Sequence, residues 1–204
     1  MTKYKINYQK YLTGAGIFIL ENFNDEWIVT LFKDHTKTYA DIGGLYESKH
    51  DSIKDTAIQE LVEESRNLFK INNKDLLKNY LDIKYNKYKD DYYRVYFLNI
   101  TQNSKLLADY NTIFENNKYI IDNDKDYSKC WKETTKMKRF YLKDLIKFKT
   151  NDINGINHKI RTRVKDIIKY INKLDNFEMI IPDSLNLKKV YNKDKTVSFI
   201  LIKD

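Results

Sequence analysis

The apolar residues near the start of the chain come in short runs of the length that β-strands have. The run Ile17–Leu20 predicts a buried strand, and Trp27–Phe32 predicts its hairpin partner beyond a turn at Asn22–Asp25. A third short strand is predicted at Tyr39–Ile42, and it leads into the glycine pair at 43–44. This part of the chain therefore predicts a sheet that ends in a glycine turn.

An amphipathic helix is predicted directly after this turn, within the stretch Gly43–Leu68. Its apolar positions recur every four residues: Ile53, Ala57 and Leu61. Ser52 is a favourable N-cap, with Asp55 three residues further on. Three acidic residues follow at positions i, i+3 and i+4, so that their carboxylates share one helix face: Glu60, Glu63 and Glu64.

The three carboxylates indicate a site for a hard cation. Like charges at this spacing destabilise a helix by about 0.2–0.5 kcal/mol per pair, and a bound cation removes that repulsion. Mg²⁺ takes oxygen ligands, usually one or two carboxylates together with substrate phosphates. A solvated acidic helix face is the alternative interpretation, and the run ELVEE by itself leaves both open.

The stretch Gly43–Leu68 resembles the signature of the Nudix hydrolase family, G-x5-E-x7-R-E-U-x-E-E-x-G-U, in which U is an aliphatic residue. The glycine pair matches the glycine turn of the signature, and residues 60–64 match E-U-x-E-E. Asp51 stands where the family has its first Glu, one residue late, and Gln59 replaces the Arg. Because Gln59 is neutral, Asp51 is expected to be held less rigidly than in the family, and the activity to be modest.

The end of the signature also departs from the family pattern. Arg66 takes the position of the family glycine, and Asn67 follows it. Asn is the residue that, after Gly, most readily adopts the left-handed conformation that ends a helix. We therefore expect Asn67 to adopt the left-handed conformation that ends the helix, in place of the missing glycine.

The resemblance implies an α/β/α sandwich with a mixed β-sheet. It also implies hydrolysis of a diphosphate linkage with Mg²⁺ or Mn²⁺ held by the Gly44 carbonyl and by Glu60, Glu63 and Glu64. In that mechanism an activated water attacks phosphorus in line, and Glu64 is one candidate for the base that takes its proton.

Trp131–Leu145 is similar to a second segment common in the family, in which a loop Glu stands some six residues before an aromatic residue. Here Glu133 precedes Phe140, and the resemblance makes Glu133 a further candidate metal ligand or base, with an ordinary loop acid as the alternative. Arg94 is also consistent with a solvent-facing strand position, and Trp131 with core packing. The candidate substrate-binding residues are Arg94, Trp131 and Lys132.

The rest of the pattern adds strands and one more long helix. Alternation predicts a hairpin from Tyr80–Tyr88 and Tyr92–Ile100, whereas Gln102–Asp126 predicts an irregular excursion with one short helix. His158–Leu174 predicts a basic amphipathic helix. Its basic residues are expected to face outward or to flank the apolar stripe: Lys159, Arg161, Arg163, Lys165 and Lys169.

The chain of 204 residues is expected to form one domain over 1–204. The resemblance covers about 13–174, and residues 175–204 form a C-terminal extension with possible strands at Leu187–Tyr191 and Val197–Ile202. That hairpin is expected either to cover a sheet edge or to mediate dimerisation. Residues 1–11 are polar and aromatic and are expected to be an ordered lead-in.

The net charge of +8 and the pI near 9.2 favour a polyanionic partner such as RNA. The abundance of Lys, Asn, Ile and Tyr is also typical of AT-rich coding, as in a virus, a parasite or an AT-rich bacterium. The single Cys130 excludes an intramolecular disulfide. Since no apolar run approaches 18 residues and no signal peptide is recognised, we expect a soluble, cytoplasmic protein without a membrane partner.

The sequence leaves several functions open. The first is hydrolysis of a small nucleoside diphosphate-linked compound, such as a nucleotide sugar, a dinucleotide or an oxidised nucleotide. The second is mRNA decapping of the viral Nudix type, which releases 7-methyl-GDP from capped RNA. Diphosphoinositol polyphosphate hydrolysis and a non-catalytic module that binds nucleotide or RNA are further alternatives.

Overall fold

The computed structural model describes residues 12–84, 91–101, 104–147, 152–153, 156–157, 159–174 and 180–202. The lead-in predicted at residues 1–11 lies outside the described residues, and so does the end of the strand predicted at Tyr80–Tyr88.

The long strand β1 (Leu12–Phe23) is the centre of a mixed sheet. It pairs with β2 in antiparallel fashion and with β7 in parallel fashion, and the strand order is β11-β3-β2-β1-β7-β6. In addition, β4 pairs with β1 and β8 pairs with β2. The other strands of this sheet are β2 (Glu26–Asp34), β3 (Thr38–Ala40), β4 (Ile42–Leu45), β6 (Tyr80–Lys84), β7 (Tyr92–Asn99), β8 (Thr134–Tyr141) and β11 (Lys159–Ile160).

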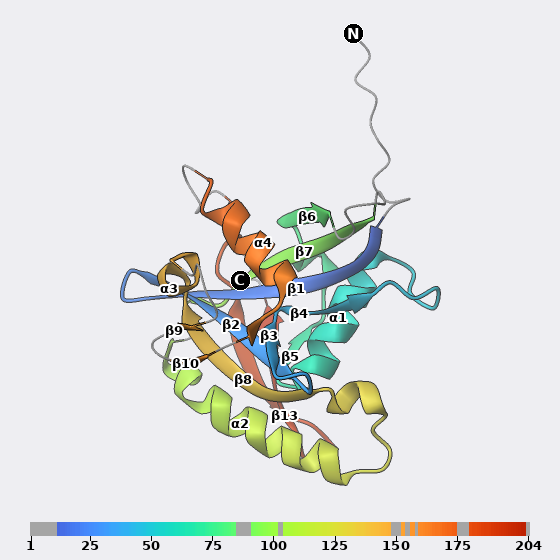
Figure 1. Ribbon diagram of the computed structural model, residues 1–204. Helices are drawn as coiled ribbons and strands as arrows, with labels where there is room; N and C mark the ends of the chain where they lie inside the picture. The colour runs from blue at the N-terminus through green and yellow to red at the C-terminus, as the bar shows by residue number, and fades with distance from the viewer. Residues whose placement is uncertain are drawn as a thin grey trace.

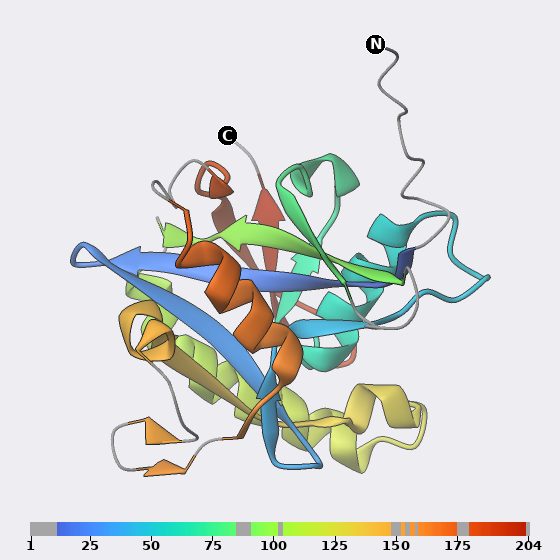
Figure 2. The ribbon, with the colours of Figure 1, turned by 45° about the horizontal axis from the view of Figure 1, so that its top comes forward.

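Helices cover both faces of this sheet, as Figures 1 and 2 show. The helices are α1 (Ile53–Glu64), α2 (Ser104–Asn123), α3 (Leu142–Ile146) and α4 (Thr162–Ile171), and the 3₁₀ turns are η2 (Lys74–Leu76) and η4 (Lys129–Lys132). Within the described part of the chain, no helix combines the length and the apolar composition that crossing a membrane requires.

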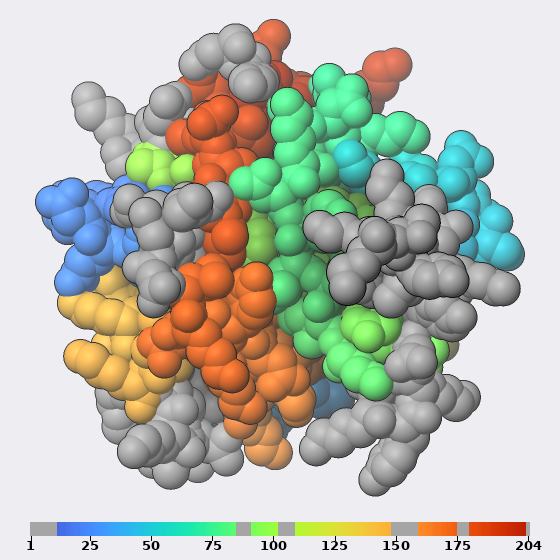
Figure 3. Space-filling model, turned by 90° about the horizontal axis from the view of Figure 1, so that it is seen from above, coloured from blue at the N-terminus to red at the C-terminus, as the bar shows by residue number. Residues whose placement is uncertain are grey.

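The alternation of β1 explains the two layers. Ile17 and Ile19 belong to a core shared with α1 and α2, whereas Phe18 and Leu20 belong to a core shared with α3 and α4. Successive side chains of a strand point to opposite faces, so one strand supports both cores. The predicted α/β/α sandwich with a mixed sheet is confirmed. Figure 3, seen from above, shows α4 lying across one face with the β6 segment beside it.

The C-terminal extension forms the predicted hairpin. Strands β12 (Asn186–Tyr191) and β13 (Val197–Ile202) pair in antiparallel fashion. Strand β13 then pairs in parallel with β5 (Phe69–Ile71), which the sequence did not predict. Phe199 and Leu201 are buried in the same core as α1. The hairpin therefore forms a separate three-stranded sheet with β5 and, among the described residues, covers no edge of the main sheet, and its expected role in dimerisation stays a prediction. A third small sheet pairs β9 (Asp152–Ile153) with β10 (Ile156–Asn157).

Two sequence predictions of secondary structure were wrong, and one strand, β8, was not predicted. Residues 104–123 form one long helix, because its buried positions Tyr110, Ile113, Phe114 and Asn117 recur every three to four residues amid polar ones. The basic helix is shorter than predicted, since β11 takes up residues 159–160 before it. Residues 134–141 form strand β8, which pairs with β2. No local sequence pattern identifies this partner.

Candidate active site

The glycine pair lies within a paired strand rather than in the free turn that the sequence predicted. In β4, Gly43 stands opposite Gly16 and Gly44 stands opposite Ala15. Gly43 has a φ of +151°, which residues with a side chain rarely adopt, and a Cβ at this position would overlap the Tyr93 hydroxyl. The close approach of β1, β4 and Tyr93 therefore requires glycine at position 43.

Helix α1 presents the acidic face as the sequence predicts. Ser52 accepts a hydrogen bond from the Asp55 backbone N–H, which caps the first turn. After the helix, Arg66 has φ 55 and Asn67 has φ 64. The left-handed Asn67 is confirmed, and the residue in the family's glycine position shares that conformation. The apolar face of the helix is buried against β1: Ile53, Ala57 and Leu61.

The three helix glutamates have three different environments. Oε2 of Glu64 accepts a hydrogen bond of 2.6 Å from the Gly43 backbone N–H. The Glu60 carboxylate occupies the space that a Cβ at Gly44 would fill. Glu63 accepts a hydrogen bond of 2.8 Å from the Gln59 side chain. The helix and the glycine strand thus form one acidic site.

Burial and the charges of neighbouring acids make Glu60 and Glu64 hard to ionise. Burial, followed by the charges of Glu63 and Glu133, raises the pKa of Glu60 to about 7. Burial, followed by the charge of Glu60, raises the pKa of Glu64 to about 8, although the Gly43 N–H acts in the opposite direction. A group of acids whose charged forms are disfavoured in this way is typical of a functional site.

Gln59 has a partner that the sequence did not indicate. Its Oε1 lies 2.6 Å from Nε2 of His50, and Nδ1 of the same ring lies 2.7 Å from the Thr56 hydroxyl. The series of hydrogen bonds from His50 through Gln59 to Glu63 orients the Glu63 side chain. Asp51 is exposed, and the expectation that it is held less rigidly stays a prediction.

The second predicted segment reaches the acidic site. Glu133 is exposed and follows η4 directly before β8. Its charge contributes to the raised pKa of Glu60, so two segments that are distant in sequence bring acids together here. The sequence could not establish this proximity, because it depends on the pairing of β8 with β2.

The other predicted substrate-binding residues have structural partners. Arg94 donates two hydrogen bonds, of 2.7 and 2.8 Å, to the Asp82 carboxylate and stacks on the Tyr80 ring. The Trp131 ring packs edge-on against Tyr127, with 5.0 Å between the ring centroids. Nζ of Lys132 donates to the backbone carbonyl of Asp124 at 2.9 Å. Their proposed contacts with substrate remain predictions.

Behind the glycine strand lies a buried ion pair that the sequence did not reveal. Nε of Arg163 donates to both oxygens of Asp41, at 2.8 and 3.1 Å, and the guanidinium lies 4.0 Å from the centre of the Tyr93 ring. Of the two positions expected for Arg163, outward or beside the apolar stripe, the outward one is excluded, since its side chain is only 9% exposed. The signal was Asp41, because an acid within an apolar strand needs a buried partner.

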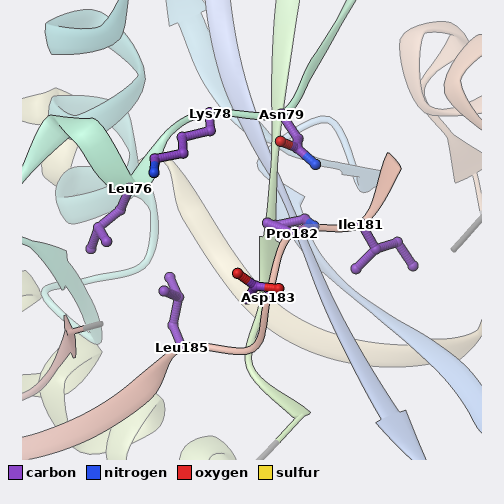
Figure 4. Close-up of a pocket in the computed structure, with 7 residues that line it drawn as sticks. All are labelled: Leu76, Lys78, Asn79, Ile181, Pro182, Asp183 and Leu185. Carbon is purple, nitrogen blue, oxygen red and sulfur yellow. The ribbon is translucent and has the colours of Figure 1, made fainter. Parts of the chain in front are cut away.

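Two hollows of the surface lie apart from the acidic face. One, of about 360 Å³, is next to the N-terminus of α4 and is lined by Lys84, Arg161 and Arg163 among others. The other, of about 180 Å³, lies between the segment before β6 and the segment before β12, and Figure 4 shows Asn79 and Pro182 lining it. None of the helix glutamates lines either hollow.

A divalent cation fits the donors that the acidic site offers. Among the described residues, no three acidic, histidine or cysteine side chains converge as a complete metal site. Mg²⁺ however needs only one or two carboxylates when substrate phosphates supply the other ligands. Glu60 and Glu64 provide these, and a Cβ at Gly14 would come within 2.5 Å of the Gly44 carbonyl oxygen, so the glycine keeps that oxygen unobstructed.

No family model and no curated protein matches the sequence. Solved structures that resemble the fold include two of an Ap4A hydrolase from C. elegans. The binary complex has 15% sequence identity and a TM-score of 0.45, over 78% of this chain and 93% of that chain. The other has 14% identity and a TM-score of 0.41, over 78% and 94%. A likeness at these values does not identify an activity or a substrate.

Proposed function

We propose that this chain is a Nudix-type, metal-dependent pyrophosphohydrolase that cleaves the diphosphate linkage of a nucleoside diphosphate-linked compound. One observation carries the proposal: the Glu60 carboxylate lies against Gly44 and the Glu64 carboxylate accepts the Gly43 N–H, so that two acids of α1 meet the glycine strand. Acids gathered in this way beside a glycine strand suit a cation on a diphosphate better than they suit a solvated helix face.

The surroundings of each acidic residue suggest whether it binds the metal ion or accepts the proton of the attacking water. Glu60, Glu64 and the Gly44 carbonyl would hold Mg²⁺ or Mn²⁺ together with substrate phosphates, and Glu63, which accepts a hydrogen bond from Gln59, is the further ligand that the resemblance implies. When bound, such an ion neutralises phosphate charge and makes a bound water more acidic. Since Glu64 already accepts the Gly43 N–H and Glu133 is exposed, Glu133 is the better placed acceptor for the proton of the attacking water.

The test is a hydrolysis assay with a nucleotide sugar, a dinucleotide, an oxidised nucleoside triphosphate and RNA labelled in its 7-methylguanosine cap. Each substrate is incubated with Mg²⁺ or Mn²⁺, and the products are separated. Turnover that requires the metal and is lost in Glu64→Gln supports the proposal. Absence of turnover on the whole panel by the folded, metal-supplied protein contradicts it and favours a non-catalytic binding module.

mRNA decapping is the second candidate because of the net charge of +8. Two arginines at the start of α4 already have acidic partners and are less available to RNA phosphates: Arg161 pairs with Asp34, and Arg163 pairs with Asp41. Exposed lysines on the C-terminal hairpin, Lys188 and Lys189, remain available for phosphate contacts. Release of 7-methyl-GDP in preference to turnover of the small substrates would favour decapping. A diphosphoinositol polyphosphate completes the panel.

A further inference from the structure

The guanidinium of Arg66 links three segments that are distant in sequence. Nε and Nη2 donate to the backbone carbonyl of Thr134 at 3.1 and 2.5 Å, and Nη1 donates to Oδ1 of Asp122 at 2.7 Å. The Arg66 side chain is 1% exposed and is among the largest fully buried side chains of the described residues. A buried arginine with this geometry therefore fastens the end of α1 to the end of α2 and to the start of β8.

The backbone of Arg66 makes this reach possible. Its φ of 55 turns the chain sharply after α1, and its N–H donates to the Glu63 carbonyl at 3.1 Å. The Arg66 carbonyl accepts the side chain of Asn117 at 2.9 Å, and the same amide donates to the Val197 carbonyl at 2.7 Å. A left-handed conformation is unfavourable for a residue with a side chain, so the surrounding hydrogen bonds hold it in place.

The carbonyl that Arg66 binds belongs to the residue directly after Glu133. The Glu133 backbone N–H makes only a long hydrogen bond of 3.5 Å to the Cys130 carbonyl, and the Glu133 side chain is exposed. Glu133 therefore lies between two charged anchors: Lys132, whose Nζ donates to the Asp124 carbonyl at 2.9 Å, and the double hydrogen bond from Arg66 to the Thr134 carbonyl. Because Arg66 lies two residues after Glu64, the Arg66 anchor ties Glu133 to the helix that carries the other acids.

We infer that Arg66 is a positioning residue that holds Glu133 at the acidic site. In the family signature this position is a glycine, which has no side chain for such a contact, so the anchor is a feature of this chain. The inference rests on the proposed function for its effect on catalysis. The placement of the 129–134 segment can be measured without any activity.

The sole cysteine of the chain reports on that placement. Cys130 lies in η4, three residues before Glu133, and its sulfur is 2.9 Å from the Ser128 hydroxyl. We expect Arg66→Met to raise the alkylation rate of Cys130 by iodoacetamide about threefold or more, because the anchor of the segment is lost. Lys118→Met is the matched control, since Lys118 donates to the same Asp122 carboxylate as Arg66 and no hydrogen bond joins it to Thr134 among the described residues. It should leave the rate unchanged.

The kinetic test uses the substrate with the highest turnover. Arg66→Met is expected to lower kcat about tenfold, with KM changed less than about twofold, because a misplaced base affects the chemical step. In a Glu133→Gln background the same substitution should lower kcat by less than about twofold further. Both substitutions remove the same contribution, that of the Glu133 carboxylate, so their effects should not add. Arg66→Lys, which keeps a charge beside Asp122, should give an intermediate kcat. It also provides a test if the Arg66→Met variant does not fold.

Several results would overturn the inference. They are an unchanged Cys130 alkylation rate in a folded Arg66 variant, an equal rise in Lys118→Met, or kcat losses that multiply fully in the double variant. If the wild-type protein shows no turnover on the panel, the proposed function fails, while the alkylation rates still decide whether Arg66 holds the segment.

Discussion

The backbone N–H of Gly43 donates a 2.6 Å hydrogen bond to the carboxylate of Glu64, which lies twenty-one residues later in the chain. This bond joins the glycine strand β4 to the last turn of α1. It also fixes one oxygen of Glu64 against the sheet, so that the rest of the acidic face has a defined position relative to Gly44. Replacing Glu64 therefore affects both the charge of the site and the junction of strand and helix.

We expect Glu64→Gln to lower kcat by about 10²-fold or more, because the variant loses a charged oxygen that a cation requires. The amide oxygen can still accept the Gly43 N–H, so the thermal midpoint should change little or rise, since the repulsion with Glu60 is removed. Steady-state kinetics with Mn²⁺ and thermal unfolding without metal provide the two measurements. A fully active Glu64→Gln variant would show that this helix does not carry the chemistry.

The two glycines should respond differently to alanine. At Gly44 the added Cβ meets the flexible Glu60 carboxylate, whereas at Gly43 it meets backbone atoms of Gly16 and Ala15 at a φ of +151. Gly44→Ala should therefore fold normally and lose activity, because Glu60 is displaced. Gly43→Ala should lower the thermal midpoint by several degrees, since the strand pair must separate. Equal losses of stability in the two variants would contradict this assignment.

Arg163 is expected to contribute to stability through Asp41. Arg163→Gln leaves the carboxylate of Asp41 buried without its charged partner, which typically costs about 3–5 kcal/mol. Lys169→Gln on the same helix is the control, because its pair with Asp166 is exposed and such pairs contribute about 0–1 kcal/mol. Urea unfolding of the two variants measures the difference, and similar midpoints would refute the buried pair.

The raised pKa values of Glu60 and Glu64 predict the pH dependence of stability and metal binding. In the metal-free protein both acids keep their protons up to pH 7–8, whereas in the unfolded chain they ionise near their ordinary pKa of 4.5. The native state therefore binds more protons, and these two groups make the free energy of unfolding fall as the pH rises from about 4.5 to 8.

Thermal unfolding between pH 5 and pH 8.5 tests this dependence, with Glu64→Gln as the reference for the remaining groups. The variant should lose less stability over that interval than the wild-type protein. Because a cation competes with the protons, the stabilisation by Mn²⁺ should be larger at pH 8.5 than at pH 6. A stabilisation by Mn²⁺ that does not depend on pH would contradict the role of these two carboxylates.

The local elements of the fold followed from the sequence where hydrophobic periodicity and end signals agreed. Helix α1 was predictable from the Ser52 cap and from the four-residue spacing of Ile53, Ala57 and Leu61. The C-terminal hairpin followed from two strand-like stretches, Leu187–Tyr191 and Val197–Ile202, on either side of a polar turn. The length of helix α2 was underestimated, because polar Asn and Asp residues, which favour turns, obscured the period of its buried positions.

The sequence by itself determined the acidic face of α1, because helix geometry alone brings residues three and four apart together. Only the tertiary structure decided what surrounds that face. The pairing of β8 with β2 brings Glu133 near Glu60, the packing of α4 pairs Arg163 with Asp41, and the left-handed turn at Arg66 reaches Thr134. These contacts join residues 68 to 122 positions apart, so their partners are set by the packing of sheet and helices, which local spacing does not encode.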